Sequence, residues 1–126
     1  MLIIRQEQMD VFFRTSRKNF MDWMFAHVKK FFPEGYQDLG NTEVREMIGY
    51  GIQKAETYGI TTERDVCKYI DLMFALGQDF DTNPDIPWVQ EILQDETLPD
   101  PEERMDRLCH MTIQKQRIGV TRDGER

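Results

Sequence analysis

The stretch from Gly59 to Trp88, GITTERDVCKYIDLMFALGQDFDTNPDIPW, constrains the fold more than any other part of the chain. Gly59 is the type of residue that ends a helix in the left-handed conformation. Thr62, followed by Asp65 three residues later, resembles a capping box, and apolar residues then recur at helical spacing as far as Gly77. This local specification predicts a defined packing role for the stretch. It does not by itself indicate any chemistry.

Helical spacing of apolar residues continues through most of the chain and predicts an all-α single-domain bundle of about five helices, with one long N-terminal helix. No strand pattern, domain linker or internal repeat is visible. In chain order, the predicted helices cover about 5–32, 41–58, 62–76, 87–93 and 101–117. The domain would span 1–118, and 119–126 would form a polar, disordered tail.

Prolines and polar caps set the predicted helix ends. Pro33 should end the first helix, and a short loop is expected over 34–40. Asp100 should cap the last helix, with Pro101 in its first position. That helix should bury one face, formed by Met105, Leu108, Cys109, Thr112 and Ile113.

Two glycines, Gly49 and Gly51, lie inside the second predicted helix, where each costs about 1 kcal/mol relative to alanine. We expect another helix to approach closely there, across an aromatic side chain of the first helix. A hinge is the alternative interpretation.

Charge and composition exclude several classes of function. The 126 residues carry a net charge of −7, which argues against nucleic-acid binding, since that needs a basic surface. No apolar run is long enough to span a bilayer. The first residues, MLIIRQEQMD, lack the pattern of a secretory signal, so we expect a cytoplasmic location. Cys67 and Cys109 fit that compartment as reduced thiols that pack as small buried hydrophobes.

An acidic loop offers a candidate cation site. Asp79, Asp81, Asn83 and Asp85 alternate as the first four ligand positions of a helix–loop–helix calcium loop do. Proline occupies the position that needs glycine, and the position that needs glutamate holds glutamine. The preferred interpretation is a turn whose side chains bond backbone amides and cap the next helix, with no metal.

Catalytic residues are hard to assemble from this sequence. Cys109 and His110 are neighbours, and adjacent residues on a helix do not face each other. The pairs Cys67–His110 and Cys109–His27 remain as alternatives. The simpler interpretation is that the thiol packs in the core and the imidazole lies at the edge of the core. No phosphate-binding loop, nucleophile elbow or zinc spacing is present. We therefore expect no enzyme activity and no cofactor.

Large apolar side chains are numerous for so small a domain, with eight phenylalanines, eight methionines and two tryptophans. A surplus beyond the core would leave an exposed patch of the kind that binds partners. The first helix is either such a surface or a central helix buried on several sides. The candidate partner-binding residues are Phe12, Phe13, Met21, Trp23 and Phe25, together with Asp79, Asp81 and Trp88 of the acidic loop.

The segments MLIIRQEQMDVF, HVKKFFPE and YGITTERDVCKYIDLMFALGQDFDTNP, with PW shortly after, resemble a group of short helical proteins encoded among type VI secretion genes of proteobacteria. The resemblance covers most of the chain, to about residue 113, and rests on helix boundaries and loop residues. It implies an accessory protein, such as an effector co-chaperone or adaptor, or an immunity protein that blocks a toxin. It implies no functional residue.

Composition and resemblance together favour a non-enzymatic module that holds a secreted effector or its adaptor through apolar side chains. An immunity protein that plugs a toxin is the first alternative. A calcium- or metal-responsive module using the acidic loop is the second. A homodimer would cover the same apolar patch as a partner protein would.

Overall fold

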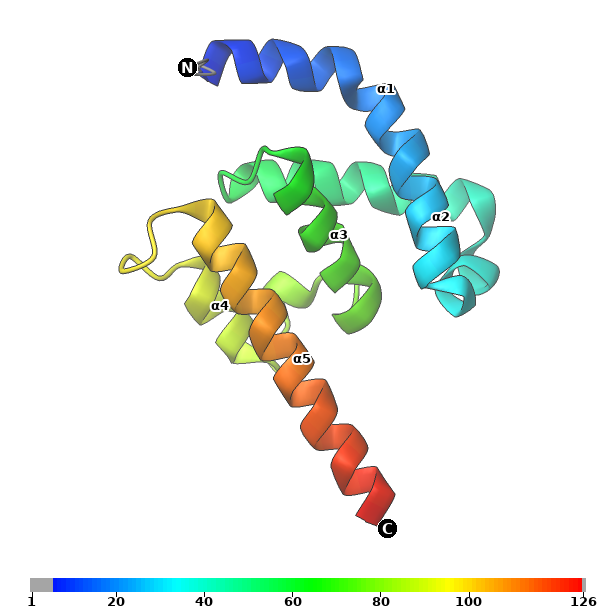
Figure 1. The fold of residues 1–126 in the computed structure, drawn as a ribbon, viewed down its shortest axis with the longest axis vertical. Helices are drawn as coiled ribbons and strands as arrows, with labels where there is room; N and C mark the ends of the chain where they lie inside the picture. Colours follow the sequence, from blue (N-terminus) through cyan, green and yellow to red (C-terminus); the bar gives the residue numbers. More distant parts are fainter. Residues whose placement is uncertain (1–5, 126) are drawn as a thin grey trace. The chain divides into compact units, whose positions relative to one another are not determined.

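The computed structural model describes the backbone of residues 6–125 and the side chains of residues 18–116. Within that part the chain is all-α, as predicted, with five α-helices, one 3-10 turn and no strand (Figure 1). The elements are α1 Gln6–Phe31, α2 Pro33–Thr57, α3 Glu63–Leu76, the 3-10 turn η1 Phe80–Thr82, α4 Pro87–Leu93 and α5 Pro101–Glu125. The long N-terminal helix is confirmed, at 26 residues. None of the helices in the described part combines the length and the apolarity needed to cross a bilayer.

The chain divides into two compact units, residues 1–78 and residues 79–126. The first unit contains α1, α2 and α3, and the second contains η1, α4 and α5. Each unit contributes its own set of buried apolar side chains.

The junction between α1 and α2 differs from the sequence prediction. Phe32 leaves helical geometry, with φ −130° and ψ 59°, because a residue before proline avoids the α region. Pro33 then occupies the first turn of α2, where its fixed φ and missing amide hydrogen are tolerated. The loop expected over 34–40 is therefore wrong for residues 34–39, which are helical. The break falls at Gly40, whose φ of +83° is a conformation that glycine adopts readily.

The core of the first unit combines one face from each of its three helices. Phe20, Met24 and Val28 of α1 stand four residues apart and are at most 4% exposed. The buried apolar residues that α2 and α3 contribute are Val44, Ile48, Ile52, Ala55, Val66, Tyr69, Ile70, Leu72 and Met73. Over its described side chains α1 is thus buried along one face, and the alternative of a helix buried on several sides is wrong there.

Gly51 marks a close approach between α2 and α3. A Cβ atom at this position would lie 2.7 Å from Ile70 Cγ1 and 2.7 Å from Met73 Sδ, so the contact depends on the missing side chain. The predicted close approach is confirmed at Gly51, but the neighbour is α3 and not an aromatic side chain of α1. A Cβ atom at Gly49 would have nothing within 4 Å, so packing does not explain that glycine.

The ends of α3 follow the sequence prediction. Gly59 adopts a φ of +76° after α2, which confirms it as the left-handed residue beyond that helix. Thr62 Oγ1 accepts a hydrogen bond of 3.3 Å from Asp65 N, which confirms the N-cap. Gly77, with a φ of +119°, ends the helix and donates its amide to Met73 O.

The second unit is built on Phe80 of η1, Val89 and Leu93 of α4, and Met105 and Leu108 of α5, all nearly fully buried. At the start of α5, the side chain of Asp100 accepts a hydrogen bond from the Glu102 amide, as its predicted role as a cap requires.

The last helix departs from the prediction in two ways. Helix α5 extends to Glu125, beyond the predicted end near 117, and residues 119–125, expected as a tail, are helical. Polar residues such as Arg and Glu are good helix formers, so polarity alone does not end a helix. Ile113 is 55% exposed, and its predicted burial is wrong. Cys109 is only half-buried.

The turn between α4 and α5 supports a prediction on acid sensitivity. The amide and the hydroxyl of Thr97 both donate to Asp95 Oδ1, at 2.8 and 2.6 Å. The hydroxyl bond is the larger cause, and together they lower the pKa of Asp95 from its ordinary value. A carboxyl group whose pKa is lower in the folded state than in the unfolded state stabilises the fold at pH values above its unfolded-state pKa. That stabilisation is lost as the pH falls through the folded-state pKa. We expect Thr97→Val to raise the pKa of Asp95, measured by NMR titration of its carboxyl carbon. An unchanged pKa would contradict this.

Candidate functional site

The outer face of α1 carries two large exposed aromatic side chains. Trp23 is 55% exposed and Phe31 is 59% exposed. His27 lies between them along the helix, with ring centroids 5.1 Å from Trp23 and 4.8 Å from Phe31. Residues four apart share a helix face, which is why these three rings form a continuous row, with His27 stacked on Trp23 and tilted against Phe31. We call Trp23, His27 and Phe31 the aromatic face.

A pocket opens between α1 and α3 beside this face. It has a volume of about 470 Å³ and is lined by Phe20, Trp23, Glu63, Arg64, Cys67 and Lys68. The α1 side of the pocket is aromatic, and the α3 side carries charged groups and a thiol. Such a combination can bind an apolar group and orient it through polar contacts.

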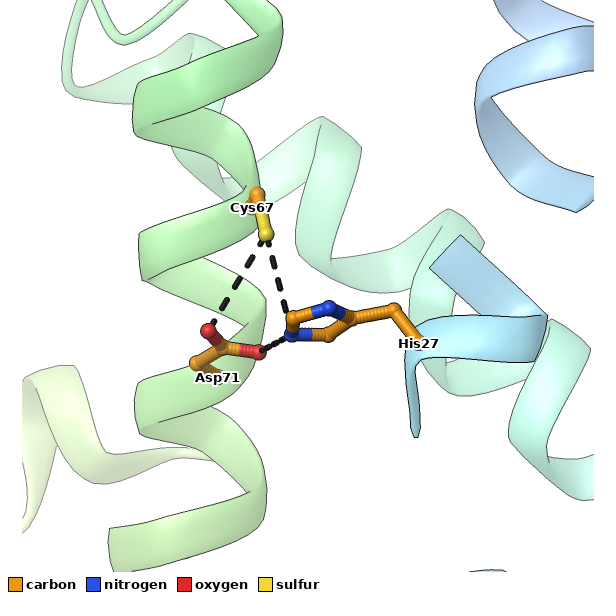
Figure 2. A network of polar contacts seen from close by, with 3 residues as sticks. All are labelled: His27, Cys67 and Asp71. Carbon is orange, nitrogen blue, oxygen red and sulfur yellow. Dashed lines mark hydrogen bonds and ion pairs between the residues drawn. The ribbon is translucent and has the colours of Figure 1, made fainter. Parts of the chain in front are cut away.

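His27 also belongs to a polar cluster with Cys67 and Asp71 of α3 (Figure 2). His27 Nε2 lies 2.9 Å from Asp71 Oδ1. Cys67 Sγ lies 3.9 Å from His27 Nε2 and 3.9 Å from Asp71 Oδ2. Cys67 and Asp71 are four residues apart, so both project from the same side of α3. The polar cluster therefore joins the two helices that form the pocket.

Burial changes the acidity of the carboxyl group in this cluster. Desolvation raises the pKa of Asp71 above its ordinary value. The attraction of His27 and the hydrogen bonds from His27 and Cys67 act in the opposite direction and offset only part of that rise. The side chains remain partly accessible, with His27 17% and Asp71 33% exposed.

The polar cluster does not have the geometry of a cysteine–histidine–carboxylate relay. In such a relay the carboxylate holds one ring nitrogen while the thiol gives its proton to the other. Here Cys67 Sγ and Asp71 Oδ1 face the same nitrogen, His27 Nε2. That nitrogen cannot donate to the carboxylate and accept from the thiol at once.

The same convergence brings together three types of metal-ligand atom. One imidazole nitrogen, one sulfur and one carboxylate oxygen all lie within 4.8 Å of one another. These are atoms that bind transition metals in proteins.

The partner-binding residues predicted on the first helix differ in their exposure to solvent. The side chains of Phe12 and Phe13 lie outside the described residues. Met21 and Phe25 are half-buried, and the Phe25 ring packs against other parts of the first unit. Trp23 is presented at the surface, and Phe31, exposed on the same face, was not among the predicted partner-binding residues.

The four residues of the acidic loop lie in the second unit and have different environments. Asp81 is 1% exposed, Asp79 and Asp85 are exposed, and Asn83 is half-buried. Asn83 Oδ1 accepts a hydrogen bond of 2.9 Å from Asp85 N, which is the kind of turn that the metal-free interpretation predicts. Among the described residues, the three aspartates do not form a converging group like the polar cluster.

The metal-free interpretation also predicted that side chains of the acidic loop cap α4, and this detail is wrong. The residue that caps α4 is Ile86, and no side chain makes a capping hydrogen bond there. Trp88 is half-buried, with Lys115 Nζ 5.3 Å from its ring centroid. This side chain is therefore partly covered by α5.

Sequence reasoning did not identify the polar cluster. It left open the pairs Cys67–His110 and Cys109–His27, whereas the structure places Cys67 against His27. The four-residue spacing of Cys67 and Asp71 is a signal that could have been read from the sequence. The third member is 40 residues from Cys67 along the chain, and only packing brings it close.

In comparisons with known proteins, no family model, no curated protein and no solved structure matches this chain. The interpretation of the site therefore rests on its own residues.

Proposed function

We propose that this chain is a non-enzymatic protein-interaction module that holds a segment of another protein on the aromatic face and in the adjoining pocket. The main observation that supports this proposal is the exposure of Trp23 and Phe31 on one side of α1, beside an open pocket. Contiguous exposed apolar side chains mark binding surfaces, and tryptophan is enriched among the residues that dominate binding energy.

The chemistry of the pocket indicates what kind of segment would bind. Phe20 and Trp23 offer apolar area for a large aromatic or aliphatic side chain. Glu63, Arg64 and Lys68 place charged groups of both signs on the α3 side, and Lys68 Nζ lies 4.0 Å from the Asp65 carboxylate. We therefore expect an apolar segment with a large anchoring side chain, flanked by polar groups that meet the charged rim of the pocket.

The resemblance to type VI secretion accessory proteins suggests the source of this segment. A secreted effector, or the adaptor that loads it, would expose an apolar segment that this module covers before secretion. A cytoplasmic site of action belongs to the proposal, and the two cysteines, neither of which forms a disulfide, are consistent with it.

The test is co-purification of the tagged full chain from its native host, followed by affinity measurements with the protein recovered. We expect Trp23→Ala to weaken binding more than tenfold, since truncating a central aromatic typically costs at least about 2 kcal/mol. Ile113→Ala is the matched control, because Ile113 is also 55% exposed but lies on α5. It should leave the affinity unchanged, and thermal melts should show both variants folded.

Three outcomes would overturn the effector-binding proposal. Recovery of only a second copy of the chain would assign the aromatic face to a homodimer. Protection of cells from a co-expressed toxin, without any gain in effector solubility, would assign the chain to the immunity proteins. Equal loss of binding in Trp23→Ala and Ile113→Ala would place the interface elsewhere.

A further inference from the structure

We propose that His27, Cys67 and Asp71 form a binding site for a divalent transition metal of the zinc class. The ligands would be His27 Nε2, the thiolate of Cys67 and a carboxylate oxygen of Asp71. This inference goes beyond the protein-interaction proposal and does not depend on any partner.

The distances in the polar cluster are close to those of a tetrahedral site. Bonds of about 2.0–2.3 Å to a tetrahedral zinc ion place neighbouring ligand atoms roughly 3.3–3.6 Å apart. The observed separations are 2.9 Å between His27 Nε2 and Asp71 Oδ1, 3.9 Å between Cys67 Sγ and His27 Nε2, and 3.9 Å between Cys67 Sγ and the other carboxylate oxygen, Asp71 Oδ2. One ligand atom from each residue lies within 4.8 Å of the other two, so a rotation of the Asp71 carboxylate and small side-chain movements would bring all three pairs into range.

Without a metal, the Asp71 carboxylate joins the other two groups, because Oδ1 accepts from His27 Nε2 and Oδ2 accepts from the Cys67 thiol. The same three side chains each offer one metal-ligand atom within 4.8 Å of the other two. A cation placed among the three atoms would contact all of them at once. The thiol would release its proton to solvent on binding, since the thiolate is the ligand.

The ligand set indicates the class of metal. Thiolate and imidazole ligands suit zinc and its neighbours, whereas calcium and magnesium prefer oxygen ligands alone. Three protein ligands leave one position of a tetrahedral ion for water or for a donor from another molecule. Cys67 also lines the pocket, so the site adjoins the surface where a partner segment would lie.

The position of His27 has a consequence for the fold. His27 belongs to α1, whereas Cys67 and Asp71 belong to α3, so a bound ion would cross-link these two helices (Figure 2). It would also hold the imidazole in place between Trp23 and Phe31, within the aromatic face.

The experiment uses the full chain, freed of metal with a chelator and then titrated with Zn²⁺ by calorimetry and with Co²⁺ by absorption spectroscopy. We expect one ion per chain, a thiolate-to-cobalt charge-transfer band, and a melting temperature that rises with zinc. Cys67→Ser should abolish the band, and His27→Gln and Asp71→Asn should each weaken zinc binding more than tenfold. Thermal unfolding of the metal-free variants establishes that each is folded. Metal binding to any one folded variant is enough to test the proposed site.

Cys109→Ser and His110→Gln are the matched controls, because they alter the other cysteine and the other histidine of the chain. Both should bind zinc and cobalt as the parent does. The proposal fails if the parent shows no saturable binding at micromolar metal. It also fails if binding survives Cys67→Ser, or if binding is lost in Cys109→Ser.

Discussion

Replacing Phe80 with alanine should lower the free energy of unfolding by about 3–5 kcal/mol. Phe80 is 1% exposed and is among the largest fully buried side chains of the second unit. Truncating it removes the transfer free energy of an aromatic ring and leaves a cavity that η1, α4 and α5 can fill only in part. Urea unfolding followed by circular dichroism measures the loss.

This prediction also bears on the acidic loop, because Phe80 lies between Asp79 and Asp81. We expect the ring of Phe80 to anchor the loop by burial, without a cation. Ile113→Ala, at an exposed position in the same unit, should change stability by no more than about 0.5 kcal/mol. A loss below about 1 kcal/mol for Phe80→Ala would show that the ring is not held in a core.

Gly51→Val should destabilise the first unit by about 1–3 kcal/mol, whereas Gly49→Ala should stabilise it by up to about 1 kcal/mol. At Gly51 the new Cβ atom would press on Ile70 Cγ1 and Met73 Sδ, each 2.7 Å away, and overpacking forces the two helices apart. At Gly49 the space is open, so alanine adds helix propensity without a clash.

The two glycines form a matched pair, two residues apart on one helix, with opposite expected signs. Thermal and urea unfolding of both variants measure the difference. Displacing α3 should also disturb the polar cluster, since Cys67 and Asp71 belong to that helix. A Gly51→Val variant that is not destabilised would contradict the packing of α2 on α3, and a destabilised Gly49→Ala variant would contradict the open space at Gly49.

The sequence alone determined the local architecture of this protein. Thr62, Gly59 and Gly77 set the ends of α3 through their own side chains or backbone freedom, and these interactions involve only near neighbours in the chain. The apolar spacing of α3 likewise predicts its buried face, which includes Val66, Tyr69 and Ile70. Pro33 follows the end of α1 as predicted, but a proline can also start a helix, and the loop expected after it was wrong for that reason.

Only the tertiary structure decided which residues form the candidate site. Apolar spacing cannot show how many elements cover a helix, so the exposure of Trp23 and Phe31 depends on where α2 and α3 pack. The polar cluster depends on the same packing, because His27 is 44 residues from Asp71 along the chain. Contacts at that separation are set by the summed packing of several helices, and no single stretch of sequence encodes them.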